Sequence, residues 1–340
     1  MRNSVVCSLI VLSFWAVLGL LALRAGASAA RDAAAPGPET SAATSFVAAA
    51  ADPAEAAAPA LPAPRMGFDA AFRLPVLREG ETVSMDLHSY LTGVLLAELP
   101  DRFADETRKA QAVASRTYAL RSYAHRRHGE AALCTGAGCC QGWQDPDSVS
   151  PERRARAEAA VAATDGLVIR YGGELIDATF FSCSGGQTED AAAVWGNELP
   201  YLRAVESPGE EAAAHFTDET RLSLSALRAA LEELDPAVRL EGAPETWIGA
   251  VTHTPGGGVD EIELGGRSFR GTQLRKRFGL RSTVFTLELN KEEAVFRTRG
   301  SGHRVGMSQY GAEAMARAGN DFVTILTWYY TGVTVEPAES

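Results

Sequence analysis

The stretch DLHSYLTGVLLAELP, residues 86–100, carries the pattern that decides the local fold. Its apolar residues recur at intervals of three or four positions, which is the period of a helix with one buried face. These residues are Leu87, Tyr90, Leu91, Val94 and Leu95. The next position of the series is Glu98, and Pro100 is expected to end the helix shortly after it. The stretch therefore predicts a glutamate at the C-terminal end of a buried helical face.

Two effects of that position favour the protonated form of Glu98. Partial burial raises the pKa of a carboxyl group, because removal from water penalises the charged form. The C-terminal end of a helix carries a partial negative charge, which disfavours another negative charge beside it. A carboxyl group that keeps its proton can act as a general acid. The alternative is a structural carboxylate paired with Arg102 or Arg116.

A second helix is predicted directly after the first. Asp105 is a candidate N-cap, and the helix is expected over residues 106–125. Lys109 and Arg116 fall on one face of this helix, about two turns or roughly 10 Å apart. They could bind an acidic ligand with charge-assisted hydrogen bonds. The alternative is a solvated basic face with ion pairs to neighbouring acids.

The rest of the folded part mixes short hairpins with helices. The predicted elements are short strands within 68–86, a hairpin over 166–181, a helix over 222–234, a hairpin over 259–271, a strand over 282–289, a glycine-rich loop over 299–306 followed by a helix to about 318, and a shorter helix from about 321. This order lacks regular alternation of strand and helix. The predicted fold class is therefore α+β, as a single mixed domain of short β-hairpins and packed helices.

The N-terminal part has a different composition. Within residues 1–30, the apolar run from Val5 to Leu23 is long enough for a signal peptide or a membrane anchor, and both interpretations stand. Residues 31–66 are rich in Ala and Pro and are predicted to form a disordered linker. The folded domain is expected over residues 67–337. The chain is therefore predicted to be exported, to a periplasmic or extracytoplasmic place, either anchored in the membrane through its N-terminal segment or secreted.

The overall composition and net charge indicate which classes of partner the chain can bind. The chain has 340 residues, 46% of them apolar, which is enough for a sizeable core. Its formal net charge of -11 argues against a nucleic-acid partner, because such partners are bound through positive surfaces.

Five phrases of the sequence, in the same order, resemble the stage II sporulation protein D family, which includes the LytB-type amidase enhancers. They are YLTGVLLAELP, KAQAVASRTYAL, FFSCSGGQTEDAAAVWGNELPYLRAV, SFRGTQLRKRFGLRSTVF, and RGSGHRVGMSQYGAEAMARAG with TILTWYYTGV. The resemblance covers about Phe68 to Val335. It implies a cell-wall protein, because family members of the sporulation type are membrane-anchored lytic transglycosylases. Those members cut peptidoglycan glycan strands, often strands from which amidases have removed the stem peptides.

The resemblance also implies roles for three residues. Glu98 matches the catalytic acid of the family's first motif, and Lys109 and Arg116 match basic residues of the second motif that are important for activity. Ordinary glycosidases need two carboxyl groups. A lytic transglycosylase can use one, because the substrate's own C6 hydroxyl is the nucleophile and the same glutamate can act as acid and then as base.

A further set of polar residues is predicted to form substrate-binding walls. In the loop 299–306, glycines would let the backbone approach a ligand closely. The candidates there and in a comparable wall are His303, Ser308, Gln309, Tyr310, Ser182, Ser184 and Tyr201. These side chains suit sugar hydroxyls and acetamido groups. The alternative is a structural turn leading into a helix, and the family commonly has Gly where Arg304 stands.

The cysteines leave alternatives open. The spacing of His128, Cys134 and Cys140 resembles the region in which some family members hold a zinc ion, with a fourth position for water or Cys139. In an exported protein the same cysteines could instead form disulfides, with one another or with Cys183, or remain thiols. Disulfides or free thiols are preferred to a zinc site as the interpretation of these cysteines. No cofactor is required for the expected reaction, and a zinc ion would be structural.

The predicted function is thus a peptidoglycan lytic transglycosylase with Glu98 as its acid and base, acting on glycan strands in cell-wall remodelling or sporulation-type engulfment. The alternative is a non-catalytic amidase enhancer or glycan-binding partner of a cell-wall hydrolase. In that case a cell-wall amidase would be the partner.

Overall fold

The computed structural model of the chain describes residues 61–339, apart from residues 127 and 137. The predicted signal or anchor segment and most of the predicted linker lie outside the described residues. The described part gathers into one compact unit. None of its helices is long and apolar enough to cross a membrane.

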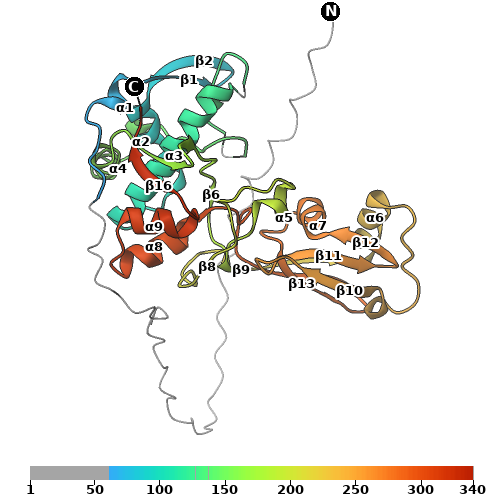
Figure 1. Ribbon diagram of the computed structural model, residues 1–340. Coiled ribbons are helices and arrows are strands. Elements are labelled where there is room, and N and C mark those ends of the chain that lie inside the picture. Colours follow the sequence, from blue (N-terminus) through green and yellow to red (C-terminus); the bar gives the residue numbers. More distant parts are fainter. Residues whose placement is uncertain (1–60, 127, 137, 340) are drawn as a thin grey trace, which may run out of the picture. The chain divides into compact units, whose positions relative to one another are not determined.

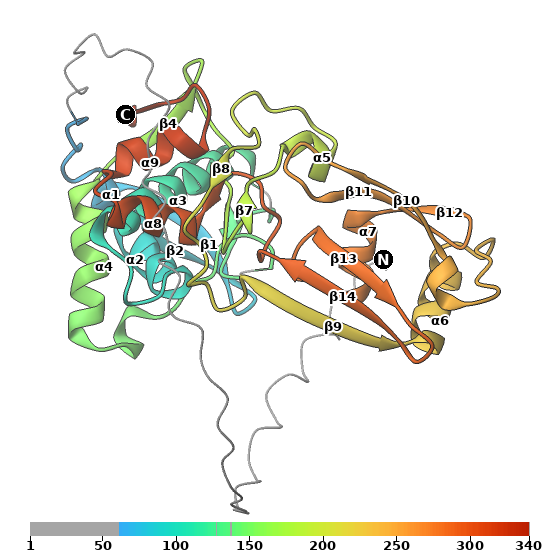
Figure 2. The same cartoon turned by 90° about the horizontal axis from the view of Figure 1, so that it is seen from below.

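Three helices form the framework that carries Glu98. They are α2 (Leu87–Glu98), α3 (Asp105–His125) and α4 (Pro151–Ala163), and each packs against the other two. Figures 1 and 2 both show them side by side. The period of residues 86–100 therefore predicts α2 correctly, with Glu98 as its last residue.

A small sheet covers the start of α2. The chain first forms the short helix α1 (Phe68–Ala71), where the sequence suggested a strand, and then the antiparallel hairpin of β1 (Arg73–Arg78) and β2 (Glu81–Asp86). Strand β3 (Leu133–Cys134) adds to β1 in parallel. This pairing fixes Cys134 at the edge of the sheet.

The other side of α3 is covered by the C-terminal helices and by short strand pairs. The elements that contact α3 here are β4 (Leu167–Tyr171), β5 (Glu174–Leu175), α8 (Gln309–Arg317) and α9 (Phe322–Tyr329). Strand β16 (Thr334–Pro337) adds to β4. The same part of the unit contains the pairs β6 (Phe180–Phe181) with β15 (Met307–Ser308) and β7 (Gly186–Gln187) with β8 (Glu206–Ser207), and the helix α5 (Ala191–Trp195). The parallel pairing of β6 with β15 brings residues near 181 and near 308 together. Helices α8 and α9 both contact α3.

The segment between β8 and β15 forms two three-stranded antiparallel sheets with their own apolar cluster. Its elements are β9 (Thr217–Ser223), α6 (Leu224–Leu234), η2 (Pro244–Thr246), β10 (Ile248–His253), β11 (Val259–Leu264), β12 (Arg267–Arg270), α7 (Gly271–Phe278), β13 (Val284–Leu289) and β14 (Glu293–Arg299). The hairpins predicted around residues 172 and 265 are present as β4–β5 and β11–β12. The chain thus mixes helices with short, mainly antiparallel strands, as predicted.

Arg304 ties this β-rich segment to the rest of the unit. Its backbone has a φ of +68°, the left-handed conformation that favours glycine. Its buried guanidinium donates to the carbonyl oxygens of Ser184 (2.9 Å), Gln187 (2.7 Å) and Gly256 (2.5 Å), and it lies 3.6 Å from the carboxylate of Glu189. These contacts explain how an arginine is held in a backbone conformation better suited to glycine.

Candidate active site

Glu98 is half-buried at the end of α2, and two donors reach its carboxyl group. The backbone N–H of Gly142 donates to Oε1 at 2.7 Å, and Nε2 of Gln309 lies 3.5 Å from Oε2. Burial raises the pKa of Glu98 above the ordinary value of a glutamate. The hydrogen bonds from Gly142 and Gln309 lower this pKa by less, because they favour the charged form. The geometry therefore suits a carboxyl group that exchanges a proton.

Residues 141–144 lie against α2 because Gly93 leaves room for them. A Cβ atom at Gly93 would lie 2.1 Å from Nε1 of Trp143, so only glycine fits there. The backbone N–H of Gln144 also donates to the carbonyl of Gly93 at 3.0 Å. This close approach brings the N–H of Gly142 to Glu98. A glycine inside an apolar helix pattern, where it would otherwise cost stability, is the sequence signal for this packing.

Gln141 forms a second link between this segment and α2. Its Oε1 atom accepts a hydrogen bond from the hydroxyl of Tyr90 at 3.0 Å, and both side chains are buried. No local pattern in the sequence assigns Gln141 or Gly142 a role in positioning Glu98. Their roles depend on contacts between distant parts of the chain, since Tyr90 and Gln141 are 51 positions apart.

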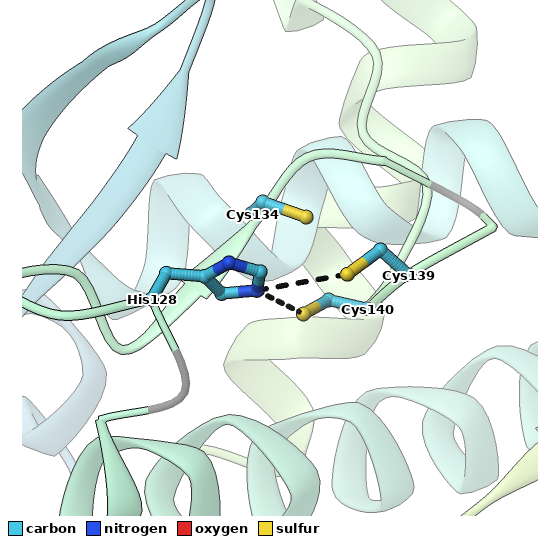
Figure 3. Close-up of side chains that lie close together, drawn as sticks. All are labelled: His128, Cys134, Cys139 and Cys140. Carbon is cyan, nitrogen blue, oxygen red and sulfur yellow. Dashed lines mark hydrogen bonds between the residues drawn. The ribbon is translucent and has the colours of Figure 1, made fainter. Parts of the chain in front are cut away.

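A cluster of one histidine and three cysteines precedes this segment (Figure 3). Nε2 of His128 lies 3.2 Å from Sγ of Cys140 and 3.7 Å from Sγ of Cys139. With Cys134, the four ligand atoms all lie within 4.8 Å of one another. Figure 3 shows the four side chains pointing toward a common centre. The structure thus brings together the three predicted metal ligands and places Cys139, one of the two candidates for the fourth position, beside them.

The donor set of this cluster fits a zinc ion. Structural zinc sites are commonly tetrahedral with three Cys and one His, at Zn–S distances of about 2.3 Å and Zn–N distances of about 2.0 Å. That geometry spaces neighbouring ligand atoms by roughly 3.5 to 3.8 Å. No two of the cysteines that the structure describes are joined by a disulfide. Cys183 does not belong to the cluster. Its backbone instead pairs with that of Ser301 in an isolated β-bridge.

Arg116 lies in the core rather than at the site. Its side chain is fully buried, and Nε and Nη2 donate to the carboxylate of Asp69 at 2.8 and 2.5 Å. Nη1 donates to the carbonyl of Leu167 at 3.1 Å. The pair therefore joins α3 to α1 and β4. This arrangement leaves no surface of Arg116 for a glycan, so its predicted contact with substrate is corrected to a structural role.

Lys109 takes part in an ion pair on its own helix. Its Nζ atom donates to Oε1 of Glu106 at 2.6 Å, and Oε2 of Glu106 accepts from the backbone N–H of Phe322 at 2.9 Å. This is the arrangement of the alternative interpretation, in which the basic residues pair with neighbouring acids. Because 28% of the Lys109 side chain stays exposed, its contact with substrate remains a prediction.

Two residues of the predicted walls lie beside Glu98 or its helix end. Gln309 contacts the carboxyl group directly. The hydroxyl of Tyr310 accepts a hydrogen bond from Arg102 at 2.9 Å, and its ring packs edge-on against Phe103 at 5.0 Å. The turn between α2 and α3 therefore meets the start of α8.

Ser184 and Ser308 face a buried carboxylate instead of solvent. Both side chains are fully buried, and their hydroxyls donate to Glu210 at 2.8 and 2.5 Å. Glu210 also accepts the backbone N–H groups of Ser184 and Gly185. The two serines therefore hold the turn after β6 against α8, and their predicted contact with sugar is corrected. Glu210 was not identified from the sequence, because it lies outside the family phrases quoted for the resemblance.

Tyr201 and Ser182 also support the structure. Tyr201 is buried, its hydroxyl accepts from the backbone N–H of Asp177 at 3.2 Å, and its ring packs against Tyr171. Its predicted contact with sugar is therefore corrected as well. The carbonyl of Ser182 accepts from the backbone N–H of Tyr310 at 3.0 Å, which positions that side chain. The hydroxyl of Ser182 remains a candidate for substrate contact.

His303 packs between two aromatic rings. Its ring centroid lies 5.5 Å from that of Phe181 and 5.3 Å from that of Trp195. Burial and the charge of Arg275 lower the pKa of His303 to about 4, so the ring is neutral at neutral pH. This neutral ring is a hydrogen-bonding and stacking group rather than a cation.

These features define a class of mixed-fold protein in which a half-buried glutamate with a raised pKa lies beside a candidate metal centre. Comparison with known proteins identifies the family within this class. The chain belongs to the stage II sporulation protein D family. The family profile described as "Stage II sporulation protein" matches residues 78–171, which include Glu98 and the histidine–cysteine cluster.

Three curated relatives align over most of this chain. It is 31% identical to the "Stage II sporulation protein D" of Bacillus amyloliquefaciens over 268 residues, 76% of each chain. It is also 31% identical to the protein of the same name from Bacillus subtilis strain 168, over 280 residues that span 78% of this chain and 80% of the relative. An "Amidase enhancer" from the latter strain is 28% identical over 295 residues, 72% of this chain and 40% of the relative. The resemblance seen in the sequence is therefore confirmed.

Proposed function

We propose that the chain is a peptidoglycan lytic transglycosylase that acts outside the cytoplasm, in cell-wall remodelling that includes sporulation-type engulfment. The observation that carries the proposal is the half-buried carboxyl group of Glu98, whose pKa is raised by burial and whose two oxygens have separate donors. Family membership supports the same assignment. The apolar run near the N-terminus supports export.

In the proposed reaction, protonated Glu98 gives its proton to the glycosidic oxygen of the glycan. The bond from this oxygen to C1 of N-acetylmuramic acid breaks, and the C6 hydroxyl of the same sugar bonds to C1. The carboxylate of Glu98 accepts the hydroxyl proton, which restores the acid and forms a 1,6-anhydro ring without consuming water. Atoms balance with a single carboxyl group.

The neighbours of Glu98 have a defined part in this step. Gly142 and Gln309 donate to different oxygens and would fix the plane of the carboxyl group. Both donors stabilise the carboxylate that exists after the first proton transfer. Burial has the opposite effect and keeps the proton in place before the transfer.

We also propose that His128, Cys134, Cys139 and Cys140 bind a structural zinc ion. A zinc ion with four protein ligands supplies folding energy rather than a reactive water. Cys140 is followed directly by Gln141 and Gly142, which contact Tyr90 and Glu98. A fixed cluster would therefore hold the donor of Glu98 in place.

A second candidate function is that of a non-catalytic amidase enhancer with a cell-wall amidase as partner. The relative named "Amidase enhancer" favours it, as does the structural role of Arg116, since that residue matches a motif linked to activity. The fold and the site would be the same in both cases. The two functions differ in whether the chain alone breaks a glycosidic bond.

The test is to incubate the purified full-length chain with glycan strands that are either intact or stripped of stem peptides. Mass spectrometry should detect 1,6-anhydromuramoyl ends with the wild type, and Glu98→Gln should lower the rate by about two to four orders of magnitude. Asp105→Asn, an exposed acid in the first turn of α3, is the matched control and should keep the wild-type rate.

Two outcomes would overturn the proposal. If the wild type forms no anhydro ends on either substrate, but accelerates an added amidase, the enhancer function replaces the enzyme. If Glu98→Gln cuts as fast as the wild type, another group is the acid.

A further inference from the structure

Trp195 presents an exposed but supported aromatic ring. It is the last residue of α5, and 41% of its surface is accessible. Its ring packs on His303 at a centroid distance of 5.3 Å, and His303 in turn packs edge-on against Phe181 at 5.5 Å. A Cβ atom at Gly302 would lie 2.7 Å from Cβ of Phe181, so the glycine lets the loop that bears His303 approach this ring. The indole is therefore held in place before any ligand arrives.

Arg275 is half-buried and has no acidic partner among the residues that the structure describes. It lies in the last turn of α7, is half-buried, and its Nε atom is buried with no hydrogen-bond partner. Within residues 61–339, leaving out 127 and 137, the structure pairs it with no carboxylate. By contrast, Arg277 on the same helix pairs with Glu233 at 2.5 Å. A half-buried cation without a counter-charge is costly, and an anionic ligand would offset that cost.

Arg275 is close to the aromatic group. Ala193 and Val194 of α5 and Thr272 of α7 line one small cavity, so the two helices are neighbours (Figure 1), and the charge of Arg275 is one of the causes of the lowered pKa of His303. Because His303 is neutral at neutral pH, it neither competes for an anion nor repels Arg275 there. This region thus combines a supported aromatic ring with a guanidinium that has no carboxylate partner in the part of the chain that the structure describes.

We propose that Trp195 and Arg275 form a second sugar subsite, apart from Glu98, that binds an acidic sugar: the pyranose ring stacks on the indole and the carboxylate pairs with the guanidinium. This inference rests on the proposed function, because that function supplies the glycan. The subsite would recognise the glycan strand at a distance from the glycosidic bond that Glu98 breaks.

The chemistry of the glycan selects the ligand group. An aromatic ring stacks on the apolar C–H face of a pyranose, and a guanidinium binds a carboxylate with two parallel hydrogen bonds. Each N-acetylmuramic acid carries one lactyl carboxylate, and this group is ionised only where the stem peptide has been removed. The subsite would therefore distinguish stripped strands from intact ones. The chain as a whole has a net charge of -11, so recognition of this anion needs a local cation.

The test uses the full-length Glu98→Gln chain, which should bind glycan without cutting it. Calorimetry would compare a peptide-free tetrasaccharide of alternating N-acetylglucosamine and N-acetylmuramic acid with the same tetrasaccharide whose carboxylates are amides. Chitotetraose, which has the rings and lacks the lactyl group, is the third probe. The free acid should bind at least about tenfold more tightly than the amide.

Variants in the same background assign the effect to residues. Trp195→Ala should weaken binding of all three probes by about three- to tenfold, and Trp195→Phe should restore most of it. Arg275→Gln should weaken only the free acid, by at least about tenfold. The matched controls are Arg277→Gln, with the same charge change on α7, and Trp328→Ala, whose indole is 44% exposed, and both should bind as the parent does.

If the free acid and the amide bind with equal affinity, the proposal of an acidic-sugar subsite is wrong, whatever the variants show. Equal losses in Arg275→Gln and Arg277→Gln overturn it as well, since they would reflect general charge. The proposed function fails separately, when wild-type chain binds the tetrasaccharide through Trp195 and Arg275 yet forms no anhydro ends from long strands.

Discussion

At Glu98, burial and hydrogen bonding act on the same proton in opposite directions. Burial favours the neutral acid, while the donors from Gly142 and Gln309 favour the anion. A general acid is most effective when its pKa lies near the working pH, so that it both keeps and releases its proton. The balance at Glu98 moves the pKa in that direction.

The raised pKa of Glu98 predicts how stability depends on pH. Between the ordinary pKa of a glutamate and the raised value, the folded chain holds a proton that the unfolded chain has lost, so stability falls as pH rises. Glu98→Gln cannot ionise and avoids this loss. Its free energy of unfolding should exceed that of the wild type at neutral pH, and the gap should narrow as the pH falls toward about 4.

Urea unfolding of both chains from about pH 4 to pH 8 measures this gap. A gap that widens on acidification would contradict a desolvated carboxylate in the folded state.

The buried ion pair of Arg116 with Asp69 is expected to be important for stability. Removing one partner of a buried ion pair leaves an unpaired charge, so Arg116→Met should lower the free energy of unfolding by about 3 to 5 kcal/mol. Adding Asp69→Leu removes the remaining charge and should recover part of the loss. Thermal or urea unfolding measures both variants.

Lys109→Met is the control, because its partly exposed pair with Glu106 should contribute only about 0 to 1 kcal/mol. A stable Arg116→Met chain that no longer binds glycan would restore the substrate-binding interpretation of Arg116.

The two residues also show what the sequence could reveal. Glu98 interrupts a regular apolar series, so its setting is visible in 15 residues of local pattern, 86–100. The setting of Arg116 depends on Asp69, which is 47 positions away and belongs to a helix of four residues. Helical spacing correctly gives the face of Arg116, and it cannot tell whether that face meets solvent or the core.

Among the elements, those with a clear apolar period were predictable, and those with a weak period or with caps from distant residues were not. Helix α4 was missed although Ser150 caps it and Pro151 starts it, because its buried face consists of the small residues Ala157, Ala160 and Val161. Such a face gives little apolar contrast.

The start of α3 shows a second limit. Asp105 was predicted as the N-cap, but Ala104 occupies that position and has no capping side chain. Glu313 from α8 replaces the local cap, because its Oε2 accepts the N–H of Ala104 at 2.7 Å and the hydroxyl of Thr107 at 2.8 Å. A cap supplied from 209 positions away has no local signature.

The cluster of His128, Cys134, Cys139 and Cys140 is expected to bind zinc. The chain should contain one zinc ion per molecule, measured by elemental mass spectrometry, and a chelator should lower its melting temperature. Cys134→Ser and Cys139→Ser should each weaken zinc binding, whereas Cys183→Ser should leave the zinc content unchanged.

Cobalt substitution gives a spectroscopic check, since the intensity of the thiolate-to-cobalt band should fall by about a third in Cys139→Ser when three thiolates become two. An unchanged band would leave Cys139 outside the site. Cysteines found joined in disulfides by peptide mapping, with no metal present, would favour the oxidised alternative.

At the scale of the whole unit, α3 links two of the three apolar clusters. Its Ala110, Val113 and Ala114 belong to the cluster with α8 and α9, and its Ala112 and Ala119 belong to the cluster with α2 and α4. Alanines on several faces let neighbouring helices approach closely on both sides. The composition of α3 therefore reflects a central position, which a one-sided amphipathic pattern would not have predicted.

Asp165 and Gly166 join the two ends of the described chain. The backbone of Asp165 accepts the N–H of Arg65 at 2.7 Å, and the carbonyl of Gly166 accepts the N–H of Ala338 at 2.7 Å. Nη1 of Arg65 donates to the carbonyl of Ala338 at 2.6 Å. The chain that leads into Arg65 therefore enters the folded unit beside Ala338. Tension applied through the chain before Arg65 would act first on these hydrogen bonds and then on α1, which packs against α2, the helix that ends at Glu98.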